Sequence, residues 1–539
     1  MTRHTALTLA LTLAVGCGGG NNNNDARDAA NDAPPAADAP DAPGMTDVPA
    51  VPDAPPATDV PGDRVAPDAD PSAPNIRTAL DCGRGMGGSG PGPNNAEAMQ
   101  RYQVDTAAFP DAICNDGSPA AIYFRPYRGE ANRNRWVINL RGGGGCGTGQ
   151  ACAARWCGCT GMRVCPSTPE TTYTNFDRGN MVSEGPASQL ASGIFLRGDA
   201  TRPNPIGDYN QVRVVYCSSD GWAGTRRASP LTAVHPVTGA PVAYTIHFLG
   251  ARIFDAVVAT LRQDGGRVPA YTLGGAGASL PDLDDAAEVI LAGDSAGGSG
   301  VINNLDRFTA MLRARNTACP AGGACPLVVR GLIDASVGPD QSRLTLSPTG
   351  QLGMAGATSY AQYIAAYGAN RFATSGAQVD ESCRAWHAAN MPGTETTCAD
   401  ENHVVRHHLS TPFFVRMALR DALISSNYHD AGWVDPTLGP FDAMAVVFAR
   451  VLQPELSAFP TLGSSTEERM IVTTPPGVFA PLCTNHDTIN DDSEVYGVTV
   501  TPTGGRASRL FDVFEAWRTG AGTASVLSDP RVNATVCPP

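Results

Sequence analysis

Residues 288–298 read Glu-Val-Ile-Leu-Ala-Gly-Asp-Ser-Ala-Gly-Gly, an apolar run that enters a glycine-rich turn around Ser295. The turn fits the pattern Gly-x-Ser-x-Gly, in which a serine lies on a sharp bend between a strand and a helix. Small neighbours are needed because the backbone packs closely there. Residues 301–312 can continue as the helix. The stretch therefore predicts a strand, an exposed serine hydroxyl and a helix; the simpler alternative is a glycine-rich turn with a solvated serine.

Other apolar runs end in comparable turns. They cover residues 136–140, 212–216 and 328–333, with a weaker example at 470–472. Nearly continuous apolar strands separated by helical stretches are typical of a parallel sheet that is covered on both faces. We therefore expect an α/β fold with a mostly parallel sheet flanked by helices. Functional sites in such sheets lie beyond the carboxyl ends of the strands.

A run of four glycines, Gly142–Gly145, follows the apolar run 136–140. Glycines allow backbone N–H groups to approach a tetrahedral oxyanion without a side-chain clash. We predict an oxyanion hole formed by the N–H groups of Gly143, Gly144 and Ala296. A loop that binds a nucleotide phosphate is the weaker alternative, because the stretch lacks both the spacing and the lysine of such loops.

A serine nucleophile on such a turn needs a base and an orienting acid, in the chain order Ser, Asp, His. Six histidines follow Ser295: His387, His403, His407, His408, His429 and His486. His486 comes after the apolar segment 478–480, and Cys483 beside it could pin its loop. His486 is therefore our candidate base. His407 and His408 resemble a polar pair on the surface of a helix.

Two aspartates are candidates for the acid. Asp334 comes straight after the apolar run 328–333, and Asp421 ends the segment 413–421. Chain order leaves both open. The acid of such enzymes usually lies one strand later than the first strand after the nucleophile, which favours Asp421.

Composition excludes several function classes. All 38 basic residues are arginine, and the formal net charge is −14. The absence of lysine excludes Schiff-base chemistry, attachment of pyridoxal phosphate and the lysine of a phosphate-binding loop. The acidic balance argues against a nucleic-acid partner.

The N-terminal residues predict export. Residues 1–16 read as the signal peptide of a bacterial lipoprotein, cleaved before Cys17, which would carry a lipid anchor at a membrane surface. The alternative is an ordinary secretory signal with a chance cysteine. Residues 17–78 are rich in Asp, Ala and Pro and predict a disordered linker. Residues 79–539 predict one catalytic domain. We expect a protein of the bacterial cell envelope, anchored through Cys17 or secreted.

Cysteine usage fits an oxidising compartment. Without Cys17, fourteen of the 15 cysteines remain, enough for up to seven disulfides. Five crowd together: Cys146, Cys152, Cys157, Cys159 and Cys165. Their spacing does not match paired zinc knuckles, so we expect a disulfide-stapled loop rather than a metal site.

Three motifs occur in order along the chain: Cys-Asn-Asp-Gly-Ser-Pro at 114–119, Tyr-Cys-Ser-Ser-Asp-Gly-Trp-Ala-Gly at 216–224 and Gly-Asp-Ser-Ala-Gly-Gly at 293–298. Together they resemble the pectin acetylesterase/Notum carboxylesterase family. The resemblance implies an α/β-hydrolase fold and hydrolysis of carboxylic esters without a metal or a cofactor. It also implies that Ser295 is the nucleophile, Asp421 the acid and His486 the base.

The chain departs from the family at one place. Where relatives have Leu-Glu-Gly-Gly followed by a bulky aromatic residue, this chain has Arg141 in place of the acid and a glycine in place of the aromatic residue. In the family, that aromatic residue helps to line the acyl pocket. We expect a serine carboxylesterase acting on short acyl esters such as acetyl, including esters carried by polysaccharide.

Two alternatives stay open. One is a non-catalytic surface lipoprotein with a hydrolase-like fold that binds polysaccharide. The other is an enzyme that cleaves glycosidic bonds, which would require a close pair of carboxylates.

Overall fold

The structure of the protein is a computed structural model, in which all described residues belong to one unit of the chain, Val65–Pro539. The structure describes residues 74–82, 90–158, 179–263, 268–320, 324–343, 345–346, 357, 359–430, 433–434, 444–459, 474–486, 488–501, 506–528 and 535–537. The predicted signal peptide, Cys17, most of the predicted linker and the weak run at 470–472 lie outside these residues.

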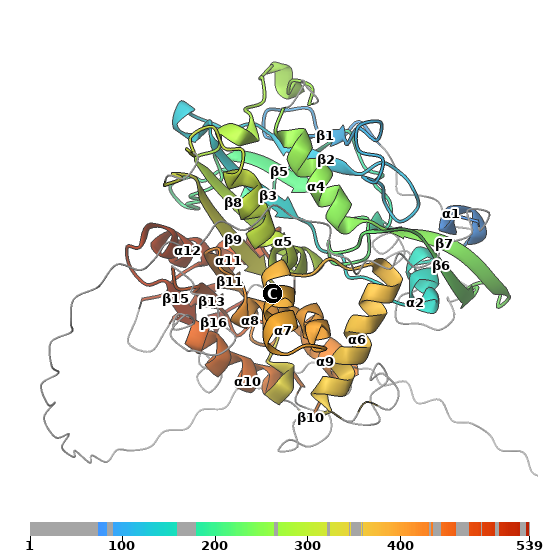
Figure 1. Cartoon of the computed structure of the whole chain (residues 1–539). Helices are drawn as coiled ribbons and strands as arrows, with labels where there is room; N and C mark the ends of the chain where they lie inside the picture. Colours follow the sequence, from blue (N-terminus) through green and yellow to red (C-terminus); the bar gives the residue numbers. More distant parts are fainter. Residues whose placement is uncertain are drawn as a thin grey trace, which may run out of the picture. The chain divides into compact units, whose positions relative to one another are not determined.

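A ten-stranded sheet runs through the described residues (Figure 1), in the order β15-β13-β11-β9-β8-β3-β5-β2-β1-β4. The strands from β15 to β5 are parallel to one another, and β2, β1 and β4 pair antiparallel. The sheet is therefore mostly parallel, as predicted. Its strands are β1 (Ala98–Gln103), β2 (Ala121–Arg125), β3 (Arg135–Leu140), β4 (Ser188–Leu190), β5 (Asn210–Val214), β8 (Glu288–Asp294), β9 (Val328–Asp334), β11 (Phe413–Arg416), β13 (Gly477–Ala480) and β15 (Ser525–Leu527).

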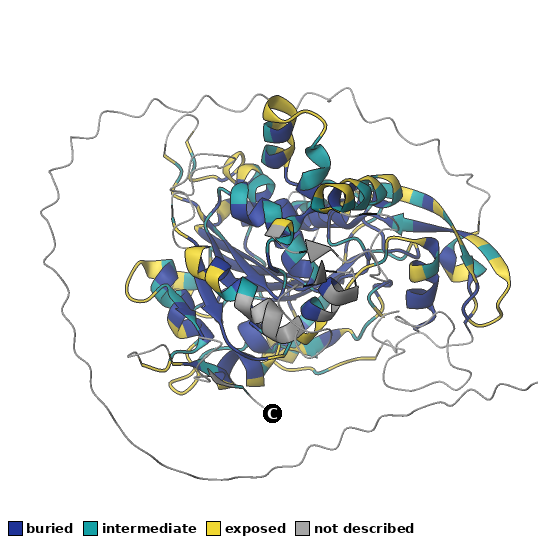
Figure 2. Cartoon of the chain, turned by 90° about the horizontal axis from the view of Figure 1, so that it is seen from below, coloured by how far each residue is buried: buried dark blue, intermediate teal, exposed yellow. Residues whose placement is uncertain are grey.

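Helices cover both faces of the sheet. Successive residues of a strand point to opposite faces, so alternate residues pack against helices on opposite sides. Val289 and Leu291 belong to the core cluster that contains α4 and α5, whereas Ile290 and Ala292 belong to the cluster that contains α12. All seven residues of β8 are buried. Figure 2 shows the strands as buried residues in the middle of the described part, with exposed residues on the surrounding helices. These helices are α4 (Gly250–Leu261), α5 (Ala296–Arg313) and α12 (Leu510–Thr519).

The remaining elements are insertions and connections around this sheet. A long insertion between β9 and β11 contains three helices. The insertion helices are α6 (Tyr360–Ser375), α7 (Glu381–Asn390) and α8 (Glu401–His407); the other elements are α1 (Ile76–Ala79), α2 (Gly149–Trp156), β6 (Arg226–Val234), β7 (Pro241–Phe248), β10 (Thr345–Leu346), α9 (Ala422–Asp430), β12 (Trp433–Val434), α10 (Met444–Ala458), α11 (Asp492–Gly497), β14 (Thr499–Val500) and β16 (Thr535–Val536). Among the described residues, no helix is long and apolar enough to cross a bilayer.

The packed part of the chain begins earlier than residue 79, the boundary expected from composition. Ile76 in α1 is fully buried, and Asn75 pairs with Thr245 of β7. A disulfide between Cys82 and Cys157 attaches the following residues to the end of α2. Buried apolar side chains, ion pairs of Arg77 with Asp116 and Glu184, and the disulfide together hold this segment against the domain.

Six disulfides lie among the described residues. They join Cys82–Cys157, Cys114–Cys217, Cys146–Cys152, Cys319–Cys325, Cys383–Cys398 and Cys483–Cys537. The predicted staple within the crowded cysteines is present as Cys146–Cys152, but Cys157 pairs outside that group. Cys159 and Cys165 lie outside the described residues.

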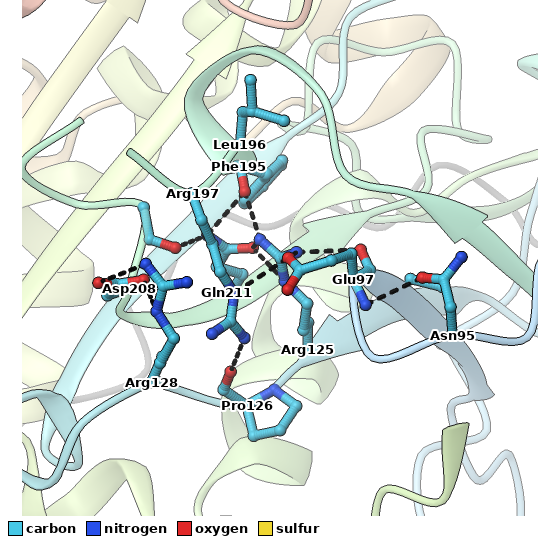
Figure 3. A network of polar contacts seen from close by, with 12 residues as sticks. Asn95, Glu97, Arg125, Pro126, Arg128, Phe195, Leu196, Arg197, Asp208 and Gln211 are labelled. Carbon is cyan, nitrogen blue, oxygen red and sulfur yellow. Dashed lines mark hydrogen bonds and ion pairs between the residues drawn. The ribbon is translucent and has the colours of Figure 1, made fainter. Parts of the chain in front are cut away.

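A buried arginine organises the antiparallel end of the sheet (Figure 3). Arg125 on β2 is 1% exposed and donates to the Gln211 side chain at 2.6 and 3.0 Å and to the Glu97 carboxylate at 2.7 Å. Burial lowers the pKa of Arg125 to about 10, so the guanidinium remains charged at neutral pH. A buried charge is tolerated only when it is paired and hydrogen-bonded. The network therefore holds the segment before β1 against the sheet.

Candidate active site

Ser295 lies on the bend between β8 and α5, at the carboxyl edge of the parallel strands. Its backbone has φ 53° and ψ −124°, a strained conformation for a residue with a side chain. The N–H of Ser295 donates to the carbonyl of Asp334 at 2.9 Å, which fixes the bend to the neighbouring strand β9. A Cβ on Gly293 would clash with the backbone of Gly297. The small residues of the motif are therefore required by close backbone packing.

Three side chains from separate segments form a continuous chain of contacts. Nε2 of His486 lies 2.8 Å from Oγ of Ser295, and Nδ1 of His486 lies 2.7 Å from Oδ2 of Asp421. Asp421 is fully buried, and its other oxygen accepts the N–H of Ile424 at 2.8 Å. A proton on Nδ1, held by the carboxylate, leaves a lone pair on Nε2 that faces the serine hydroxyl. The arrangement can therefore move a proton from Ser295 to His486.

Backbone pairing between two loops brings His486 to Asp421. The N–H groups of Leu419, Arg420 and Ala422 donate to the carbonyls of Pro481, Cys483 and Thr484 at 2.8, 3.1 and 3.0 Å. The disulfide Cys483–Cys537 ties the same loop to the C-terminal segment. The loop after β13 thus runs alongside the loop after β11, and the two side chains meet.

Asp334, the other candidate acid, makes different contacts. Its carboxylate accepts the backbone N–H groups of Thr488 and Ile489, each at 2.9 Å, and lies 3.2 Å from the Arg416 guanidinium. Burial raises the pKa of Asp334, and the charge of Arg416 opposes that rise. Asp334 therefore holds the segment that follows His486. Sequence reasoning did not find this role, although the position of Asp334 at the end of a strand marked it as a residue near the site.

Hydrogen bonds on both sides hold the glycine loop. Oδ2 of Asp294 accepts the N–H of Gly142 at 3.1 Å, and the indole of Trp222 donates to the carbonyl of Arg141 at 3.0 Å. The Arg155 side chain donates to the carbonyl of Gly143. The second residue of the Gly-Asp-Ser motif and the tryptophan of the motif at 216–224 thus support the loop.

The predicted oxyanion-hole residues lie close to this serine. Gly144 and Ala296 line the same cavity as Ser295, whereas Gly143 is not among its lining residues. Gly143 and Gly144 have φ values of 144° and 67°, which favour glycine. Within the described part of the chain, no acceptor receives a hydrogen bond from the N–H of Gly144 or Ala296. These two N–H groups are therefore available to a ligand.

A cavity of about 430 Å³ opens beside Ser295, between the glycine loop and the insertion helices. Arg371 of α6 and Glu401 of α8 form an ion pair at 2.9 Å in its wall, and Glu401 also accepts the hydroxyl of Ser299 at 3.2 Å. Tyr363 and Tyr367 stack with ring centroids 5.9 Å apart. Polar and charged groups therefore make up much of the wall. Sequence reasoning missed these side chains because the insertion carries no motif.

Comparison with known proteins shows which family and which solved structures this chain is similar to. Residues 93–325 match the family model described as pectinacetylesterase. A palmitoleoyl-protein carboxylesterase NOTUM of Drosophila melanogaster is 33% identical over 197 residues, 36% of this chain and 22% of that protein. The Schmidtea mediterranea protein of the same name is 29% identical over 229 residues, 42% of this chain and 34% of that protein. The structure of the Wnt deacylase Notum from Drosophila aligns with TM-score 0.52 and 22% identity, covering 80% of this chain and 96% of that chain.

Residues 93–325 thus match the pectinacetylesterase family, and the chain is similar to Notum proteins in sequence and in structure. The structural similarity establishes the α/β-hydrolase-like fold. In sequence, the aligned segment spans only 22% and 34% of the two relatives' own lengths. The match to the family model includes Ser295, Ala296 and the glycine loop, whereas Asp421 and His486 lie beyond its end.

The departure from the family pattern has a structural counterpart. Nη1 of Arg141, which stands where the resemblance implies an acidic residue, lies 3.8 Å from the buried carboxylate of Asp294. The glycine run places Gly144 and Gly145 in the cavity wall, and these contribute no side chain. At these two positions, the cavity wall next to Ser295 is therefore formed by backbone alone.

Proposed function

We propose that the protein is a serine carboxylesterase in which Ser295 is the nucleophile, His486 the general base and Asp421 the orienting acid. The observation that carries the proposal is the unbroken chain of contacts from Ser295 Oγ through His486 to the Asp421 carboxylate. The strained backbone of Ser295 supports it, because nucleophiles of this class lie on such bends. The family assignment agrees with ester hydrolysis.

In the proposed reaction, His486 takes the proton of Ser295 as Oγ attacks the ester carbonyl, and Asp421 stabilises the imidazolium. The alcohol then leaves with the proton from His486, and water hydrolyses the acyl-serine by the same route. The N–H groups of Gly143, Gly144 and Ala296 are proposed to bind the oxyanion. Each such donor contributes about 3–4 kcal/mol to transition-state stabilisation.

We propose that the substrates are short acyl esters, such as acetyl esters, carried by polysaccharide. The polar wall built by Arg371, Glu401 and the stacked pair Tyr363 and Tyr367 supports a hydroxyl-rich alcohol part. A long acyl chain binds favourably only against an extended apolar wall. Covering a charged ion pair with such a chain would instead remove water from the charges without replacing its hydrogen bonds. Relatives named as palmitoleoyl-protein carboxylesterases would then differ from this protein in acyl length.

Serine labelling tests the catalytic proposal. The wild type should react with a fluorophosphonate probe and hydrolyse nitrophenyl acetate, and Ser295→Ala should lose both. Ser457→Ala is the matched control, because Ser457 is an exposed serine of α10 whose hydroxyl donates to the carbonyl of Gln453 within the same helix. Labelling retained in Ser295→Ala, or an unlabelled and inactive wild type, would contradict the proposal; the second result would favour a non-catalytic polysaccharide-binding protein.

A substrate panel tests the acyl and alcohol preferences separately. Nitrophenyl esters of increasing acyl length should show kcat/KM falling beyond butyrate. Release of acetate from acetylated pectin and xylan should depend on Ser295. Faster hydrolysis of palmitate than of acetate would overturn the short-acyl proposal while leaving the triad intact.

We also propose that the chain is exported and anchored through a lipid on Cys17. The support is the sequence pattern before Cys17 and the six disulfides of the described residues, which form in oxidising compartments. Metabolic labelling with a clickable palmitate should mark the wild type and spare Cys17→Ala. An unlabelled wild type in the cell envelope would contradict the anchor.

A further inference from the structure

Three histidines of the insertion between β9 and β11 converge away from the serine site. Nε2 of His403 lies 3.1 Å from Nε2 of His387 and 3.2 Å from Nε2 of His408. His387 comes from α7, His403 from α8 and His408 from the residue that ends α8. His387 and His408 are 2% and 1% exposed, so the expectation that His408 belongs to a polar surface pair is wrong.

The proton on His387 can be assigned from its neighbours. The hydroxyl of Thr394 donates to the carbonyl of Met391 at 2.6 Å, so its oxygen is the acceptor of the 2.7 Å contact with Nδ1 of His387. Nδ1 therefore carries the proton, and in the neutral ring Nε2 presents a lone pair toward Nε2 of His403. Metal-binding histidines commonly show this pattern, in which the second nitrogen donates to an outer partner.

The ring nitrogens of the cluster cannot all pair with one another. Nε2 of His403 faces two nitrogens and can carry at most one hydrogen. Because Nε2 of His387 carries no hydrogen, the two contacts cannot both be good hydrogen bonds, and a cation among the three nitrogens would use their lone pairs instead.

We propose that His387, His403 and His408 form a binding site for one divalent transition-metal ion, with zinc as the expected metal. Zinc binds histidine nitrogen at about 2.0–2.1 Å, so nitrogens of a tetrahedral site lie about 3.3–3.4 Å apart. The two observed separations of 3.1 and 3.2 Å need to widen by only tenths of an ångström, and the candidate ligand atoms of all three histidines lie within 4.8 Å of one another. Three imidazoles leave the fourth position open for water.

Cys383 lies beside the cluster, and its sulfur is within 4.8 Å of the candidate nitrogens. Because Cys383 is bonded to Cys398, it is not available as a thiolate ligand in the oxidised protein. The disulfide instead joins α7 to the segment before α8 and so keeps the histidines close. The site is therefore a three-histidine site, and its affinity should not require reduction.

The proposed ion would fix the wall of the active-site cavity. His403 lies two residues after Glu401, the first residue of α8, whose carboxylate pairs with Arg371 in the cavity wall. An ion that joins α7 to α8 would hold that start of α8 in place. The site lies outside the proposed triad, so metal binding and ester hydrolysis can be tested independently.

Metal content of the full, exported chain under non-reducing conditions provides the test. After removal of metal with a chelator and dialysis against dilute zinc, the wild type should retain one zinc per chain and melt at a higher temperature than the metal-free form. His403→Gln and His408→Gln should lose this zinc and the shift. His407→Gln is the matched control on the same helix, because its ring is not among the converging nitrogens, and it should keep both.

Cobalt provides a readout that needs no variant to fold. Cobalt bound by three histidines and water in the wild type should give the intense visible absorption of a tetrahedral site, and zinc should displace it. The proposal is overturned if the wild type retains no zinc, if His403→Gln and His408→Gln retain it as the wild type does, or if zinc binds only after reduction of Cys383–Cys398.

Discussion

The carboxylate of Asp334 accepts the backbone N–H of Ile489 at 2.9 Å, three residues beyond His486. This bond ties the end of β9 to the loop that carries the proposed base. The aspartate that was an alternative acid thus supports the position of the histidine, while Asp421 contacts its ring.

Replacing these two aspartates should separate the two roles. Asp334→Asn should lower the free energy of unfolding by about 3–5 kcal/mol, since it leaves the buried charge of Arg416 without its partner. Asp421→Asn should lower kcat about 10⁴-fold with a smaller effect on stability, because the amide favours the wrong tautomer of His486. Denaturant unfolding and steady-state kinetics on both variants check this. Equal losses of kcat at unchanged stability would argue against the assignment.

Gly142→Ala should inactivate the enzyme. A Cβ at this position would lie 2.8 Å from Cβ of Ser295 and even closer to the carbonyl of Asp294, so the loop or the nucleophile bend must shift. We expect kcat/KM for nitrophenyl acetate to fall at least 100-fold, as with loss of an oxyanion donor. Gly277→Ala is the control, because a Cβ there meets nothing within 4 Å. A fully active Gly142→Ala would show that the loop does not need its present position.

The disulfide Cys483–Cys537 should matter more for stability than Cys319–Cys325. The first pair is 54 residues apart and the second 6, so closing the longer loop removes more entropy from the unfolded chain. The double serine variants should lose about 4 and about 2 kcal/mol, respectively. Only the first should also reduce kcat, because it releases the loop of His486. Thermal unfolding and nitrophenyl acetate turnover test both expectations.

Asp380 should make stability depend on pH. Burial raises its folded-state pKa to about 6, and the charge of Asp306 adds to the rise. The folded state therefore binds this proton at a higher pH than the unfolded state does. The resulting contribution to stability is fully present below about pH 4 and is lost as the pH rises through about 6. Asn caps helices as well as Asp does, so Asp380→Asn removes mainly the titration.

The measurable quantity is the difference in unfolding free energy between the wild type and Asp380→Asn from pH 4 to pH 7. The unfolding free energy of the wild type minus that of Asp380→Asn should decline by about 2–3 kcal/mol over this range, since one pKa unit corresponds to about 1.4 kcal/mol. A difference that stays constant with pH would contradict a raised pKa for Asp380.

Local patterns in the sequence determined several strands of the fold and the position of the proposed nucleophile. Apolar runs predicted strands at β3, β8 and β9 because buried parallel strands need apolar side chains on both faces. At Ser295, small neighbours predicted the bend because only such residues permit close backbone packing. Both signals lie within about ten residues, where covalent geometry and burial act directly.

Only the tertiary structure decided which distant side chains meet. The pairing of the loops after β11 and β13 places His486 on Asp421 rather than Asp334, and α7 with α8 brings His387 to His403. The same holds for Cys82 and Cys157. Such contacts depend on loop paths, strand register and helix packing summed over many residues, so no short stretch of sequence encodes them.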